Sequence, residues 1–112
     1  MIFDTHTHYD NAAFDEDRDE LLMSLLAAGI GKVVNVGASI ESTKRTVKLT
    51  EEYPFIYGAA GVHPSESGEM AEEDLLWLEE LTRREKVVAV GEIGLDYYWK
   101  EPEISIQKHW FV

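Results

Sequence analysis

The run KVVNVG at residues 32–37 indicates the fold class of this chain. It has the length of a β-strand, and its apolar residues do not alternate strictly with polar ones, a pattern typical of a parallel strand covered on both faces. Similar runs of strand length are IFDT at residues 2–5, FIYGAAGV at 55–62 and VVAVGE at 87–92. We therefore expect a parallel sheet of four strands.

Helical patterns follow each of these strands. They begin near Asp15, Ile40, Met70 and Glu103, and the first three run to Gly29, Tyr53 and Arg84. Asp15 and Ser39 are the expected N-caps of the first two helices. The leucines expected to face the sheet are Leu21, Leu22, Leu25 and Leu26 in the first helix and Leu75, Leu78 and Leu81 in the third. Strand and helix thus alternate, which favours an α/β fold with right-handed crossovers.

The spacing of the strands predicts a TIM-like (β/α) barrel. A complete barrel of about 250 residues averages about 31 residues per βα unit, so this chain would hold about four units. We expect residues 1–112 to form a single domain that is the N-terminal half of such a barrel. An open doubly wound sheet is the second choice, because its first turn is normally rich in glycine and the turn here is THTHY at residues 5–9.

Composition restricts the chemistry that the chain can support. The absence of cysteine excludes thiolate chemistry and leaves His, Asp and Glu as metal ligands. The net charge of −12 argues against a broad basic surface for nucleic acid. Lys32, Lys44, Arg45 and Lys48 form the one basic stretch, which we interpret as a solvated helix face without a role. No apolar run is long enough to cross a membrane, and the expected location is the cytoplasm.

Three polar side chains at predicted strand ends point to a metal site. His6 and His8 end the first strand and Glu92 closes the fourth, at the edge where barrel enzymes place their active sites. Residues i and i+2 of a strand share one side, so both imidazoles face the same way. An ionised Glu92 inside a barrel needs a partner. The alternative to a cation is a salt bridge to Lys32 or Lys100, but two histidines beside a carboxylate favour a metal.

The motifs around these residues resemble one known family. The runs DTHTH at residues 4–8, GVHP at 61–64 and GEIGLDYY at 91–98 are similar in type and spacing to the TatD-type metal-dependent deoxyribonuclease family of the amidohydrolase superfamily. The resemblance covers essentially the whole chain. It implies a TIM-like barrel that hydrolyses phosphodiester bonds in DNA with two divalent ions, Mg, Mn or Zn.

The resemblance also assigns roles to individual residues. It implies that His6 and His8 bind one metal ion and that Glu92, the catalytic carboxylate, bridges two. His63 is expected to touch the substrate phosphate, with a simple turn residue as the alternative. Asp96 is either a substrate-binding residue or a turn cap.

Two further predictions concern residues beside the proposed site. Asp4 is expected to orient a ligand histidine by accepting its second N–H, and the alternative is a simple hydrogen-bonding role at the strand end. Tyr97, Tyr98 and Trp99 could stack on bases, but packing in the core or at its rim is the preferred interpretation.

Some ligands that the family uses are absent from this sequence. The family completes its site with two histidines and an aspartate from later strands, so we expect this chain to be an incomplete fragment that is inactive alone. It would associate with itself or with the missing C-terminal half. One alternative function is a related amidohydrolase that acts on C–N bonds, although a carboxylated lysine often replaces Glu92 there. Another is an inactive half-barrel that serves as an interaction module.

Overall fold

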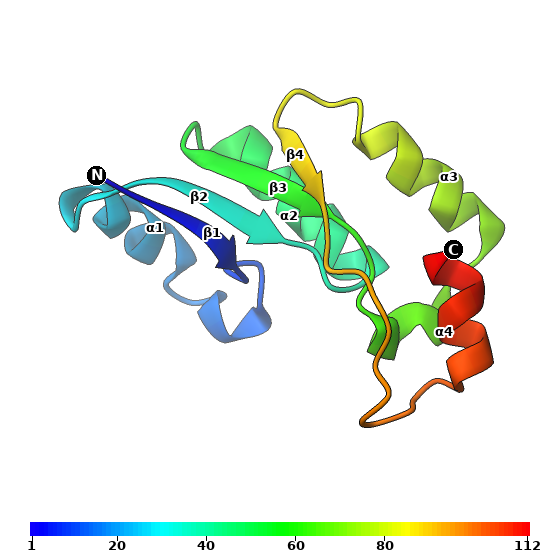
Figure 1. Ribbon diagram of the computed structural model, residues 1–112. Helices are drawn as coiled ribbons and strands as arrows, with labels where there is room; N and C mark the ends of the chain where they lie inside the picture. Colours follow the sequence, from blue (N-terminus) through cyan, green and yellow to red (C-terminus); the bar gives the residue numbers. More distant parts are fainter.

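A computed structural model describes residues 1–112 and contains one four-stranded parallel sheet in the order β1-β2-β3-β4 (Figure 1). The strands are β1 (Ile2–Thr7), β2 (Ile30–Val36), β3 (Ile56–Ala60) and β4 (Val87–Val90). The α-helices are α1 (Arg18–Ala27), α2 (Ile40–Glu52), α3 (Glu72–Leu81) and α4 (Ile104–Phe111), and two short 3-10 helices are η1 (Ala12–Phe14) and η2 (Pro64–Glu69). The predicted parallel sheet and the predicted alternation of strand and helix are confirmed.

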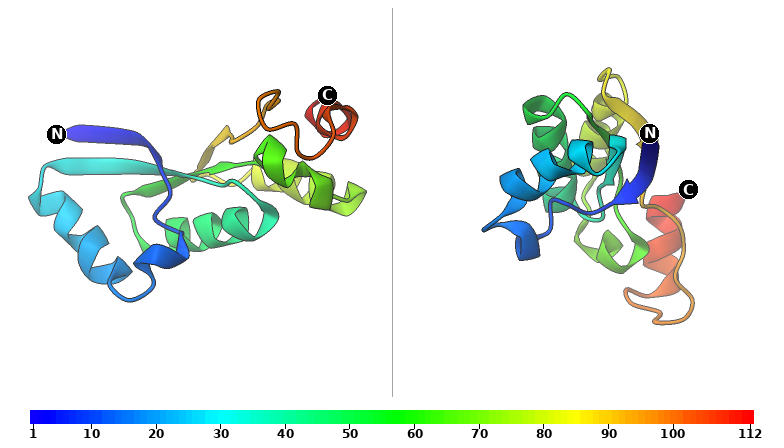
Figure 2. Two further views of the ribbon diagram at one scale, coloured as in Figure 1. Left: turned by 90° about the horizontal axis from the view of Figure 1, so that it is seen from below. Right: turned by 90° about the vertical axis from the view of Figure 1, so that its left-hand side faces the viewer.

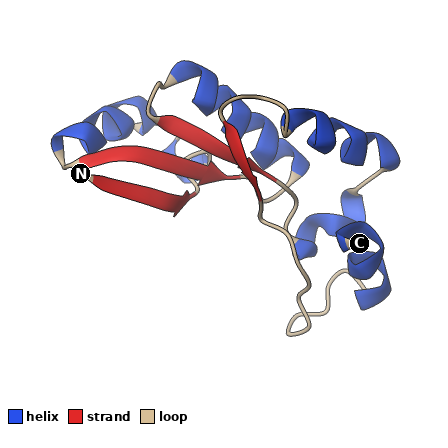
Figure 3. Ribbon diagram, turned by 45° about the horizontal axis from the view of Figure 1, so that its top comes forward, coloured by secondary structure: helices blue, strands red, loops and turns tan.

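Neighbouring strands pair in parallel along the whole sheet. Val33 of β2 lies between Asp4 of β1 and Ile56 of β3, and Ala60 of β3 pairs with Val90 of β4. Because all four strands run in the same direction, their carboxyl ends meet at one edge of the sheet (Figure 3). This edge carries the residues that follow β1 and β4.

The core lies between the sheet and helices α1 to α3. One apolar cluster joins α1, β2, α2 and β3 through Leu22, Leu25, Val33, Leu49, Tyr53 and Ile56. A second cluster joins α2, β3, α3 and β4 through Val47, Ala60, Leu81 and Val87. Burial of one such large side chain contributes about 1.5–3 kcal/mol, so these contacts hold the helices against one face of the sheet.

The other face of the sheet is open, which corrects the expectation that the strands are covered on both sides (Figure 2). Ile2, Val88 and Val90 are 57%, 53% and 57% exposed. In a barrel this inner face is filled by side chains from all the strands around the axis, so four strands cannot cover it by themselves.

The start of α1 differs from the prediction. The helix begins at Arg18 after Asp17, whereas Asp15 lies before it and accepts a hydrogen bond from Arg18 Nη2 at 2.7 Å. Leu22 and Leu25 are buried as predicted, but Leu26 is exposed. The 3-10 turn η1 delays the helix, because Asn11 caps that turn by accepting from the Ala13 N–H.

The other helices follow the sequence pattern more closely. Ser39 caps α2 as predicted, because its hydroxyl oxygen accepts from the backbone N–H of Ser42 at 3.0 Å. In α3 Leu81 is buried, whereas Leu75 is exposed. None of the helices has both the length and the apolar character that a membrane span requires.

Candidate metal centre

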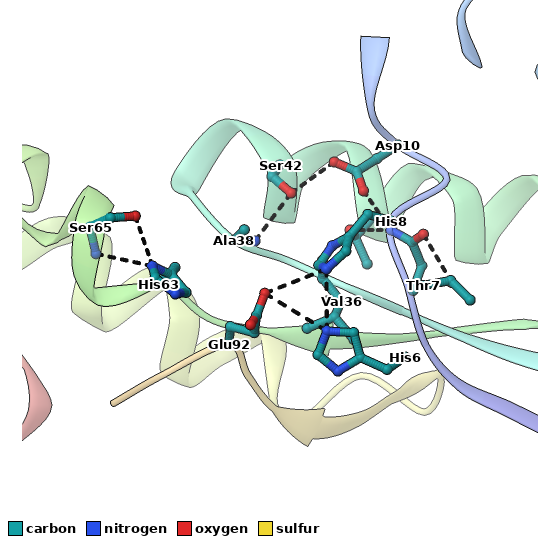
Figure 4. A network of polar contacts seen from close by, with 12 residues as sticks. His6, Thr7, His8, Asp10, Val36, Ala38, Ser42, His63, Ser65 and Glu92 are labelled. Carbon is teal, nitrogen blue, oxygen red and sulfur yellow. Dashed lines mark hydrogen bonds and ion pairs between the residues drawn. The ribbon is translucent and has the colours of Figure 1, made fainter. Parts of the chain in front are cut away.

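The side chains of His6, His8 and Glu92 converge at the carboxyl edge of the sheet (Figure 4). His6 Nε2 lies 3.2 Å from His8 Nε2, and Glu92 Oε2 lies 3.5 Å from His8 Nε2 and 3.9 Å from His6 Nε2. Atoms bound at about 2.1 Å to one tetrahedral ion are about 3.4 Å apart. The three separations bracket that value, so these residues fit a single divalent cation.

The ring of His8 is held in one tautomer. Its Nδ1 lies 3.0 Å from the backbone carbonyl oxygen of Val36. A carbonyl oxygen only accepts, so this Nδ1 carries the proton and the lone pair of the ring is on Nε2. That lone pair faces the Glu92 carboxylate. Two acceptor atoms 3.5 Å apart, such as His8 Nε2 and Glu92 Oε2, repel each other unless a proton or a cation lies between them. A lone pair on one ring nitrogen, with the other nitrogen donating to a backbone carbonyl, is the arrangement that a metal-binding histidine needs.

A buried polar network fixes the chain immediately after His8. Asn35 of β2 is fully buried, and its Oδ1 accepts from the backbone N–H of Tyr9 at 2.6 Å. Its Nδ2 donates to Asp10 Oδ1 at 2.9 Å, while the other oxygen of Asp10 accepts from Ser42 Oγ at 2.8 Å. The loop that carries the second histidine is therefore tied to both β2 and α2.

Sequence reasoning missed this network. The signal available was Asn35 itself, a polar side chain within the apolar run VVNV at residues 33–36, since a buried amide requires partners. Asp10 follows His8 by two residues and is also buried. Because an ionised carboxylate is seldom buried without hydrogen-bond donors, its burial implies such partners.

The backbone at the ends of β2, β3 and β4 positions Glu92. Its N–H donates to the carbonyl oxygen of Gly37 at 2.7 Å, and the N–H of Gly91 donates to that of Ala60 at 3.0 Å. Gly61 passes so close to Gly91 that a Cβ at residue 61 would overlap the Gly91 carbonyl group. A glycine is required there for the two strand ends to approach.

The salt-bridge alternative for Glu92 is not observed. The basic side chains within 4.0 Å of its carboxylate are the two histidine rings. Lys32 points instead to the hydroxyl of Tyr57 at 3.4 Å. Lys100 forms no ion pair in the structure, and the Glu92 side chain is about one-third exposed.

Asp4 does not make the expected contact with a histidine ring. Its Oδ1 accepts from the backbone N–H of His6 at 3.3 Å. The group that orients a ring is the carbonyl of Val36, which accepts from His8. Burial raises the pKa of the neighbouring Tyr9 phenol, and the charge of Asp4 raises it further.

His63 and Asp96 are placed in turns. His63 precedes η2, and its Nδ1 accepts from the backbone N–H of Ser65 at 3.1 Å and from Ser65 Oγ at 2.7 Å. Its proton is therefore on Nε2, which makes no hydrogen bond within the chain. Asp96 Oδ1 accepts from the backbone N–H groups of Tyr98 and Trp99 at 2.9 and 3.1 Å, which is the geometry of a turn cap.

The aromatic residues after Asp96 are not packed in the core. Tyr98 is 83% exposed and Trp99 is 73% exposed, and Tyr97 is also exposed, so the preferred interpretation as packing residues is wrong for this chain. The turn itself is held firmly, because the buried Gln107 side chain bonds to both the N–H and the carbonyl oxygen of Asp96.

Comparison with known proteins places these features in a family. A family model described as TatD related DNase matches residues 3–112. The chain is 43% identical over 111 residues to the uncharacterized metal-dependent hydrolase YabD of Bacillus subtilis (strain 168), covering 99% of the chain and 44% of that relative. It is 32% identical over 110 residues to the 3'-5' ssDNA/RNA exonuclease TatD of Cronobacter turicensis, covering 98% and 42%.

Solved structures show the same fold. The TatD homolog YjjV from Escherichia coli K12 superposes with a TM-score of 0.84 at 35% identity, over 98% of this chain and 43% of that one. A TatD family hydrolase from Entamoeba histolytica gives a TM-score of 0.82 at 22% identity, over 96% and 42%, a likeness of fold. The chain thus spans less than half the length of these relatives, and its sheet is of the TIM-barrel type.

Proposed function

Since the chain belongs to the TatD related DNase family, we propose that His6, His8 and Glu92 form part of a two-metal centre that hydrolyses phosphodiester bonds in DNA. The observation that carries the proposal is the convergence of the three ligand atoms within 4.8 Å of one another. Imidazole nitrogen suits transition metals, whereas magnesium prefers an all-oxygen set, so the site favours Zn²⁺ or Mn²⁺ over Mg²⁺.

The protein side chains prepare the site for this chemistry. Val36 holds the lone pair of His8 Nε2 toward the metal position, so no proton has to leave that nitrogen when a cation binds. Glu92 presents Oε2 to both histidines, so this carboxylate would hold a cation together with them and would also help to hold a second one. A bound divalent cation would supply Lewis acidity, which activates water and neutralises the charge that develops on phosphate.

The proposal also accounts for the charge of the chain. A protein with a net charge of −12 repels a polyanion, whereas cations bound at one edge provide a local positive charge for one phosphate. His63 offers its free Nε2–H as a donor to a phosphate oxygen. The relative from Cronobacter turicensis is named for action on single-stranded DNA and RNA, which supports a single-stranded substrate.

Hydrolysis requires more ligands than this chain brings together. Catalytic zinc sites commonly use three protein ligands for one ion, and here three ligands would serve two. We therefore expect residues 1–112 alone to bind a cation without cleaving DNA. The further ligands would come from residues that the chain does not contain or from a partner.

A chimera tests the proposal. This chain would replace the matching part of the Cronobacter turicensis exonuclease, and the purified chimera would be incubated with Mn²⁺ and an end-labelled single-stranded DNA 20-mer. We expect Mn²⁺-dependent cleavage that is lost in the His6→Ala and Glu92→Gln chimeras. The matched control is His109→Ala, which removes an exposed histidine of α4 and should leave cleavage unchanged.

A chimera that is folded and binds Mn²⁺ but leaves the 20-mer intact would overturn the proposal. Cleavage that survives His6→Ala would equally remove this residue from the centre.

A further inference from the structure

A polar pocket of about 440 Å³ extends from the candidate metal centre along α2. His8 and Glu92 line one part of it, and Arg45 of α2 lines another. We propose that Arg45 binds a phosphate of the nucleic-acid substrate next to the one that is cleaved. This inference rests on the proposed function, because it assumes that the metal centre binds the scissile phosphate.

Arg45 is the only cationic side chain that lines the pocket. The other charged lining residues are the carboxylates Asp10, Glu41 and Glu92. Both oxygens of Asp10 already accept hydrogen bonds within the buried network, and Glu92 belongs to the metal centre. A second phosphate in this pocket would therefore find Arg45 as its one source of positive charge other than bound cations.

The guanidinium of Arg45 has free donors. Its side chain makes one polar contact, the ion pair from Nε to Glu41 Oε1 at 3.8 Å, and the two side chains are 50% and 68% exposed. Exposed pairs of this kind are weak. Arg18 shows the opposite case, since its guanidinium donates to three backbone carbonyl oxygens and to Asp15. Arg45 is thus available for a phosphate, which its planar fork can bind through two parallel hydrogen bonds.

The volume of the pocket suits one nucleotide beyond the cleaved bond. Ala12 and Ala38 are among the lining residues, and their small side chains leave room for a sugar. The volume lies within the range of about 300–1,000 Å³ that is typical of small-molecule sites. Two of the three proposed metal ligands, His8 and Glu92, line the same pocket as Arg45, so we expect neighbouring phosphates of one strand to reach both.

This assignment separates Arg45 from the rest of the basic stretch. Lys32, Lys44 and Lys48 do not line the pocket, and Lys48 pairs with Glu52 at the far end of α2. On this proposal Arg45, although it is exposed like the rest of the basic stretch, has a role that the three lysines do not have.

The test measures binding of fluorescein-labelled single-stranded d(TTTT) by anisotropy in the presence of Mn²⁺, over a series of NaCl concentrations. We expect Arg45→Gln to raise the Kd about tenfold, as loss of a charge-assisted pair implies. The slope of log K against log salt should fall by about 0.7, the value for one phosphate contact on a single strand. Arg83→Gln is the matched control, because Arg83 also pairs with a glutamate four residues earlier but lies outside the pocket.

A second variant gives a gain of affinity. Glu41→Gln removes a carboxylate that competes with phosphate for Arg45 and that repels phosphate by its own charge. We therefore expect this variant to bind d(TTTT) two- to threefold more tightly. Mn²⁺ affinity, measured separately, should be the same in wild type and Arg45→Gln. If Mn²⁺ binds but wild type and Arg45→Gln bind d(TTTT) equally, this inference is overturned and the proposed function stands. A wild-type chain that does not bind Mn²⁺ would overturn both.

Discussion

Replacement of Asn35 by alanine should destabilise the fold strongly, because this buried amide joins the loop after β1 to the helix layer. The side chain is 0% exposed. It accepts from the Tyr9 N–H at 2.6 Å and donates to Asp10 Oδ1 at 2.9 Å and to Thr46 Oγ1 at 2.8 Å. Asn35→Ala removes these three hydrogen bonds and a longer one that Asn35 Oδ1 accepts from Thr7 Oγ1 at 3.4 Å, and it leaves the partners without this amide.

The magnitude follows from these contacts. Each of the two bonds to neutral partners contributes about 1 kcal/mol, and the bond to the Asp10 carboxylate contributes about 2 kcal/mol. The expected loss in free energy of unfolding is therefore about 4 kcal/mol. A small domain has only about 5–15 kcal/mol in total, so the variant should lose a large part of its stability.

Urea denaturation followed by circular dichroism measures this loss. Asn35→Asp is the informative second variant, because it preserves the shape but places a carboxylate against Asp10. Two carboxylates in contact share a proton more readily than separate ones, so the folded variant binds a proton that the unfolded chain releases. Its stability relative to Asn35→Ala should therefore rise as the pH is lowered from 7 to 5. A loss below about 1 kcal/mol for Asn35→Ala would refute the reasoning.

Three shorter predictions concern other parts of the molecule. The hydrogen bond from the Tyr53 hydroxyl to Asp19, together with burial and nearby acidic charge, raises the pKa of Tyr53 to about 12. The folded state keeps a proton that the unfolded chain loses near pH 10, so this stabilisation is complete below pH 10 and is lost as the pH rises toward 12. Urea titrations should show a smaller alkaline loss in Tyr53→Phe, and equal losses would contradict the assignment. Gly61→Ala should lower the melting temperature by several degrees and weaken Mn²⁺ binding, because the alanine Cβ would overlap the Gly91 carbonyl beside Glu92. An unchanged melting curve would argue against the close approach of the two glycines. Acidification from pH 7.5 to 5 should weaken Mn²⁺ binding in a titration, since protons compete with the cation for the imidazole nitrogens, and an affinity that is flat with pH would exclude the histidines as ligands.

The convergence of His6, His8 and Glu92 could be predicted from the sequence for a simple reason. Parallel strands bring their carboxyl ends to one edge, so residues at the ends of β1 and β4 meet there. His8 and Glu92 lie 84 positions apart in the sequence but side by side at this edge. The strand pattern alone is enough to place them on that edge.

The supporting contacts could not be predicted in the same way. The apolar run of β2 shows that Asn35 is unusual, but it does not identify Tyr9 and Asp10 as the partners. Asp4 accepts from the backbone N–H of His6, whereas the backbone carbonyl of Val36 contacts the ring of His8. Sequence patterns do not identify backbone acceptors of this kind.

Two other differences arose in turns. The N-cap predicted at Asp15 was wrong because the chain first forms η1, a short element without a periodic signature. Tyr98 and Trp99 were expected to pack, but the turn that Asp96 caps presents both side chains to solvent. Turn geometry of this kind depends on tertiary contacts such as those of Gln107 rather than on local sequence.

Mn²⁺ binding to the purified chain, measured from the electron paramagnetic resonance signal of the free ion, tests the metal centre most directly. We expect the wild-type chain and His109→Ala to bind Mn²⁺ equally, and His6→Ala, His8→Ala and Glu92→Gln each to lose more than about tenfold in affinity. If those three variants bind Mn²⁺ as the wild type does, the side chains that meet at the sheet edge are not its ligands, and the central claim is contradicted.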